Sequence, residues 1–137
     1  MGESMHPSYF GVRFRIPQPV KDWPPCFAIL SGYATTGEVW TTERNEGADR
    51  ALGEALKKRG GWLQRITGFF PDTGHAEPGW AVGIDYENAQ ELGLRFHQDA
   101  IFLVSGNRVW VSTCGVDRCR AEIGAFDERF EMDETLE

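Results

Sequence analysis

The pattern of apolar and polar positions predicts two strands at the beginning of the chain. In residues 9–16, apolar side chains alternate with glycine and arginine in the order YFGVRFRI. This period of two is typical of a strand with one buried face. The proline-rich residues 17–25 cannot lie within a central strand. Residues 26–34, CFAILSGYA, begin with a continuous apolar run, which indicates a strand covered on both faces.

Two later segments have the spacing of amphipathic helices. The first spans residues 45–59, where a narrow apolar stripe ends in three basic residues and Gly60 can terminate the helix. The second spans residues 86–97, and Asp85 before it can serve as the N-cap. The positions at helical spacing are Ala48, Leu52, Ala55, Leu56 and Arg59 in the first helix and Ala89, Leu92 and Phe96 in the second.

The remaining apolar runs predict four more strands, and together the elements predict the fold class. The runs occupy residues 62–70, 80–85, 100–104 and 108–112, with a loop over 71–79 and a hairpin turn over 105–107. Two helices separated by a pair of strands favour an α+β fold. We predict a two-layer sandwich of the split βαβ kind, with two helices on a mainly antiparallel sheet of five to six strands.

Length and charge narrow the class of protein. The 137 residues suit one domain, which we assign to residues 1–126, and the formal net charge is −7. Residues 127–137 carry six carboxylates against Arg129 alone, so we expect an acidic, frayed tail. An acidic chain without a basic stripe is a poor ligand for duplex nucleic acid. The sequence has no apolar run long enough for a membrane span and no signal peptide, so we expect a cytoplasmic protein.

The cysteines and histidines do not predict a cofactor or a metal site. Cys114 and Cys119 form a C-x4-C motif, but no histidine lies at the spacing of a zinc site. An odd number of cysteines also argues against a disulfide framework. We therefore expect reduced thiols, no metal and no cofactor.

Four blocks of sequence resemble a bacterial family catalogued as domain of unknown function 3293. The blocks lie within residues 27–104 and read FAILSGYAT, ERNEGADRALGEAL, GFFPDTGHAEPGWAVGI and ELGLRFHQDAIFLV. The resemblance implies a shared fold, and it places Asn45, Glu77 and Gln98 at the polar positions typical of the family. It implies no activity. The family often has an Asn-Pro step where this chain has YATTG, so the resemblance assigns no role to that loop.

The predicted ends of helices and strands suggest a polar site formed by Asn45, Glu77 and Gln98, together with His75. Element ends are where loops meet the sheet and where binding sites are commonly built. The same side chains could instead satisfy backbone donors and hold the loops closed. We therefore expect a binding or regulatory module that takes a small polar ligand or a protein partner. The alternative is a small hydrolase that uses Glu77 with His75 or His97 as acid–base groups.

Overall fold

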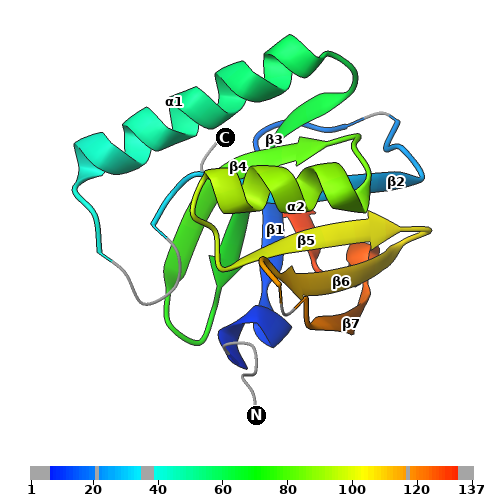
Figure 1. The fold of residues 1–137 in the computed structure, drawn as a ribbon. Helices are drawn as coiled ribbons and strands as arrows, with labels where there is room; N and C mark the ends of the chain where they lie inside the picture. Colours follow the sequence, from blue (N-terminus) through cyan, green and yellow to red (C-terminus); the bar gives the residue numbers. More distant parts are fainter. Residues whose placement is uncertain (1–6, 21, 35–38, 117, 133–137) are drawn as a thin grey trace.

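The computed structural model describes residues 7–20, 22–34, 39–116 and 118–132, and Figure 1 shows two helices beside a strongly curled sheet. The helices are α1 (Thr42–Arg59) and α2 (Tyr86–Arg95), and the two short 3-10 helices are η1 (Pro7–Gly11) and η2 (Phe126–Glu128). The strands are β1 (Arg13–Ile16), β2 (Cys26–Ser31), β3 (Leu63–Phe70), β4 (His75–Val82), β5 (Ala100–Ser105), β6 (Arg108–Thr113), β7 (Arg120–Ala125) and β8 (Phe130–Met132).

The described strands form one eight-stranded sheet in the order β7-β6-β5-β2-β4-β3-β1-β8. All neighbours are antiparallel except β1 and β8, which are parallel. In the centre, α1 joins β2 to β3 across β4, and α2 joins β4 to β5 across β2. These are two interleaved split βαβ units, as the sequence predicts. The prediction of five to six strands is wrong, because β7 and β8 extend a mixed sheet at its two edges.

Each face of the sheet carries its own apolar core. The face that carries the helices buries Leu52 and Leu56 of α1 and Ala89 and Leu92 of α2 against the central strands. The opposite face, enclosed by the curl, holds a larger aromatic cluster. Its buried rings are Tyr9, Phe14, Phe27, Phe70, Phe102 and Phe126. Among the described residues, no helix combines the length and the apolar character that crossing a membrane requires.

Strand β4 begins earlier than the sequence predicts. Its first residues are predicted to form a loop because of their composition, which is rich in glycine and proline. In the structure, β4 pairs with β3 from His75 onwards, and β2 on its other side ends at Ser31 opposite Gly79. The Pro78 carbonyl accepts a bond from the Ser31 hydroxyl, so this carbonyl faces β2. The N–H and the carbonyl of one residue point to the same side of an antiparallel strand, so the N–H that Pro78 lacks would also face β2, beyond its last residue. No bond of the strand ladder is lost there.

Several other predicted boundaries shift by a few residues. The beginning of the first predicted strand is the 3-10 helix η1, and β1 begins only at Arg13. Helix α1 begins at Thr42 rather than near Asn45, because the Thr41 hydroxyl accepts the Arg44 N–H at 3.1 Å as an N-cap. Helix α2 has the predicted N-cap, Asp85, and ends at Arg95 rather than at residue 97.

The sequence predicts a frayed tail from residue 127 onwards, but residues 127–132 belong to the fold. Strand β8 pairs with β1, and the Glu131 carboxylate accepts bonds from Arg15 at 2.8 Å and Arg13 at 3.0 Å. Hydrogen bonds from these two arginines lower the pKa of Glu131. Phe130 packs against Trp23, with ring centroids 5.4 Å apart. A strand of three residues lacks a periodic signal in the sequence, and residues 133–137 lie outside the described residues.

We expect a chain that ends at Arg129 to melt at least about 5 °C below a chain that ends at Met132, a loss of roughly 1 kcal/mol. The shorter chain loses the Phe130 ring and the Glu131 carboxylate, while the longer chain keeps both. Thermal unfolding followed by circular dichroism measures the difference. Equal melting temperatures would show that β8 contributes nothing to stability.

Candidate functional site

Asn45 and Gln98, two of the predicted site residues, hold the same peptide group. The Asn45 Oδ1 accepts the N–H of Ala34 at 2.8 Å, and the Gln98 Nε2 donates to the carbonyl of Tyr33 at 2.9 Å. That carbonyl and that N–H belong to one peptide bond. Asn45 lies in the first turns of α1 and Gln98 follows α2, so the two helical segments clamp the chain where it leaves β2. We call this arrangement the peptide clamp.

Ser31 supports the peptide clamp and was missed by the sequence analysis. Its hydroxyl accepts the N–H of Tyr33 at 3.0 Å and donates to the Pro78 carbonyl at 2.9 Å. The first bond turns the chain out of β2, and the second ties that turn to β4. A serine hydroxyl that bonds a backbone N–H two residues later is a common local turn. The Ser-Gly-Tyr sequence after an apolar run therefore carried a usable signal.

Glu77 and His75 form a pair on one face of β4. The His75 Nε2 lies 2.9 Å from the Glu77 Oε2, as expected for residues two apart in a strand. The Glu77 side chain is 13% exposed, whereas that of His75 is 43% exposed and stacks on Phe70. The hydrogen bond to Glu77 raises the pKa of His75, and partial burial opposes the rise.

The predicted polar residues converge only in part. Glu77 and Gln98 both line a cavity of about 20 Å³ between β2, β4 and the aromatic core, and Asn45 does not line it. Such a volume holds about one water molecule and no substrate. His97 is exposed and makes no hydrogen bond to Glu77 within the described residues. The His75–Glu77 pair therefore has proton-transfer groups in contact, but no cavity beside it fits a substrate.

The cysteines show no arrangement suited to metal or redox chemistry in the part of the chain that the structure describes. All three are free thiols, and no group of three or more His, Cys, Asp or Glu side chains could hold a metal ion there. Burial, with a smaller effect of the Asp99 charge, raises the pKa of Cys114 to about 11. A thiol with that pKa stays protonated and unreactive near neutral pH.

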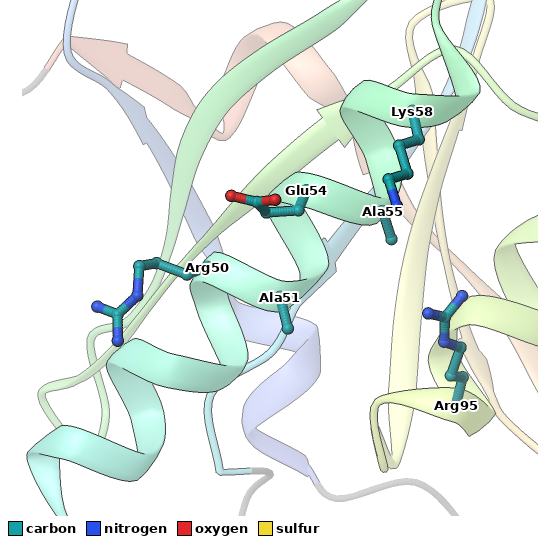
Figure 2. Close-up of a pocket in the computed structure, with 6 residues that line it drawn as sticks. All are labelled: Arg50, Ala51, Glu54, Ala55, Lys58 and Arg95. Atoms are coloured by element: carbon teal, nitrogen blue, oxygen red, sulfur yellow. The ribbon is translucent and has the colours of Figure 1, made fainter.

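A larger depression lies between α1 and α2, and the sequence analysis did not predict it. This inter-helix groove has a volume of about 560 Å³. In Figure 2, Ala51 and Ala55 point from α1 toward α2, and Arg95 extends toward them from the end of α2. The lining residues are Arg50, Ala51, Glu54, Ala55, Lys58 and Arg95.

The inter-helix groove exists because α1 contacts the sheet through a narrow stripe. Leu52 and Leu56 are fully buried, and Gly53 sits directly on Trp80, where a Cβ would lie 2.7 Å from the indole ring. Ala51 and Ala55 form a neighbouring stripe that does not reach the sheet core. Ala55 is thus not part of the buried stripe in which the sequence pattern places it. Two small side chains beside α2 leave open space.

The charges of the inter-helix groove are unpaired. Arg50, Lys58, Arg95 and Glu54 make no ion pair with any described residue, whereas six ion pairs form elsewhere among those residues. Three cations against one carboxylate leave the groove positive on a chain of net charge −7. The arrangement can attract and hold a negatively charged group.

Comparison with known proteins agrees with the resemblance seen in the sequence. Residues 34–101 match the model of a family described as "Protein of unknown function (DUF3293)". The matched segment contains both helices and the central strands β3 and β4. No curated protein and no solved structure matches the chain.

We expect Gln98→Ala to lower the free energy of unfolding by about 1–2 kcal/mol, because the clamped carbonyl loses a buried donor. Gln64→Ala is the matched control, since among the described residues the Gln64 amide bonds only to the adjacent Arg65 carbonyl. Urea titrations of both variants measure the effect. A loss no larger than that of Gln64→Ala would show that the peptide clamp is not a structural element.

We expect the His75–Glu77 pair to stabilise the fold more at low pH than at high pH. The folded-state pKa of His75 is raised, so its contribution is fully present below the unfolded value and is lost as pH rises through the folded value. Because His75 is partly exposed, the contribution should be only about 0.5 kcal/mol. Wild type and Glu77→Gln are compared in urea at about pH 5.5 and about pH 8.5. A stability difference that grows with pH would contradict this sign.

Proposed function

We propose that this member of the DUF3293 family is a binding module that recognises an acidic segment of a partner protein in the inter-helix groove. The proposal is carried by one observation. The groove is lined by three cations that make no ion pair with any described residue, beside two small alanine side chains, on a chain of net charge −7. Lys58 and Arg95 point into the gap between the helices, whereas Arg50 extends away from both (Figure 2). Cations beside an open depression attract a complementary partner and discriminate against cationic ones.

The spacing of the cations fits a short stretch of polypeptide. Arg50 and Lys58 are eight residues apart on α1, a rise of about 12 Å along the helix axis. Arg95 stands across the gap from Lys58 and Ala55 (Figure 2). An extended chain covers about 12 Å with roughly four residues. Such a segment could place carboxylates near the cations and a small apolar side chain on Ala51 and Ala55.

A protein segment fits the inter-helix groove better than nucleic acid or a small metabolite does. Binding to a duplex is dominated by neutralisation of many phosphates, which a chain of net charge −7 with three groove cations does not provide. Small-molecule sites usually enclose most of the ligand's surface. The inter-helix groove instead lies open between two helices, as shallow peptide-recognition surfaces do.

The site of the His75–Glu77 pair supports a catalytic function less well. Its two groups are within hydrogen-bond distance, which favours the hydrolase alternative. The adjoining cavity of about 20 Å³ does not admit a substrate. The described residues therefore support a binding function better than they support hydrolysis.

The test uses a fluorescein-labelled peptide of alternating Glu and Ala and its counterpart of alternating Gln and Ala. We expect the acidic peptide to bind in a fluorescence-anisotropy titration, with an affinity that falls as salt screens the charges. Lys58→Gln with Arg95→Gln should weaken binding roughly 10-fold, or about 1.4 kcal/mol. The matched control is Arg108→Gln with Arg118→Gln, which changes the net charge equally at two exposed sites remote from the inter-helix groove.

Three results would overturn the proposal. Equal weakening by the control variant would mean that only net charge matters. Unchanged binding by the Lys58 and Arg95 variant would place the site elsewhere. Tighter binding of single-stranded oligothymidylate than of the acidic peptide would make nucleic acid the ligand.

A further inference from the structure

A second pocket lies on the helix-bearing face of the sheet, where α2 leaves the sheet uncovered. Helix α2 packs on β2 and β5, while β6 and β7 extend past it (Figure 1). The pocket between the beginning of α2 and these strands has a volume of about 320 Å³, which is within the range of small-molecule sites. Its apolar walls come from Ile84, Tyr86, Leu103 and Trp110.

The Tyr86 wall of this pocket is held rigidly. The Tyr86 hydroxyl lies 3.0 Å from the Ser112 Oγ, and Ser112 is fully buried. The buried Gln90 amide donates to the same Ser112 oxygen at 3.0 Å and to the Thr113 carbonyl at 2.9 Å. The network fixes the aromatic ring before any ligand arrives, which lowers the entropic cost of binding.

Arg120 gives the pocket an available cation. Its two neighbours on this side of the sheet are paired, Arg118 with Glu87 and Arg108 with Glu122. Arg120 makes no ion pair within the described residues and lies 5.1 Å from the centre of the Tyr86 ring. The pocket also contains the Asp85 carboxylate, but that group is engaged as the N-cap of α2, where its Oδ1 accepts the Asn88 N–H at 2.9 Å.

We infer that this pocket binds a small molecule that combines a flat apolar ring with a carboxylate. The ring packs between Tyr86, Leu103 and Trp110, and the carboxylate accepts two parallel hydrogen bonds from the Arg120 guanidinium. The volume suits one or two fused rings. This site is separate from the inter-helix groove, so either proposal can fail alone.

The probe is naphthalene-2-carboxylate, compared with its uncharged carboxamide. In an NMR titration, the Trp110 indole N–H should shift on addition of the carboxylate at up to about 1 mM. The carboxamide should bind roughly 10-fold more weakly. Arg120→Gln should weaken binding of the carboxylate by about the same factor, and Arg120→Lys should restore only part of it, since lysine lacks the planar fork.

Arg59→Gln, at an exposed position at the end of α1 outside both pockets, is the matched control, and it should leave the affinity for naphthalene-2-carboxylate unchanged. The inference is overturned if the acid and the amide bind equally, if Arg120→Gln has no effect, or if the largest shifts lie away from Trp110. It is also overturned if no binding is seen at about 1 mM. Indole and amide spectra that match wild type confirm that each variant is folded.

Discussion

Helix α1 is fixed to the sheet by an ion pair and two close approaches, and the rest of the account depends on that attachment. The Arg65 guanidinium donates twice to the Asp49 carboxylate, each bond 2.7 Å long, and once to the Gly79 carbonyl at 3.2 Å. The Asp49 side chain is 15% exposed, so the pair is largely shielded from water. Removing either partner would leave an uncompensated charge there. At Gly32, a Cβ would lie 2.7 Å from the Ala48 carbonyl oxygen, so no larger residue permits the same approach.

This attachment explains why one helix both completes the core and leaves a groove. Because two leucines and an ion pair hold α1, its other flank is not needed for packing, and Ala51 and Ala55 face open space. The peptide clamp strengthens the arrangement, since Asn45 in α1 holds the same peptide bond as Gln98 after α2. The polar residues at the element ends thus set where the helices sit, and the inter-helix groove lies between the helices they position.

Local periodicity predicted the parts of the fold that local forces determine. The alternation of Phe14 and Ile16 with arginines, the N-cap at Asp85 and the hairpin at residues 105–107 are all present. Strand β8 is set by pairing with β1, more than a hundred residues away in the sequence, and no window of sequence contains that information. The Asp49–Arg65 pair joins a helix to a strand, and Lys58 and Arg95 line one groove from different helices, so the periodicity of single elements predicts neither arrangement. Element ends and the family resemblance indicate Asn45 and Gln98 as polar positions, but the peptide bond that both side chains hold is set by the tertiary fold.

The central claim is that acidic polypeptide lies between α1 and α2, and spin-label NMR tests it most directly. The peptide of alternating Glu and Ala, carrying a nitroxide at one end, is added to protein with assigned alanine methyl signals. The account predicts that paramagnetic broadening is strongest at the Ala51 and Ala55 methyls and weak at the Ala121 methyl on β7. Broadening at Ala121 equal to or greater than that at Ala51 would contradict it.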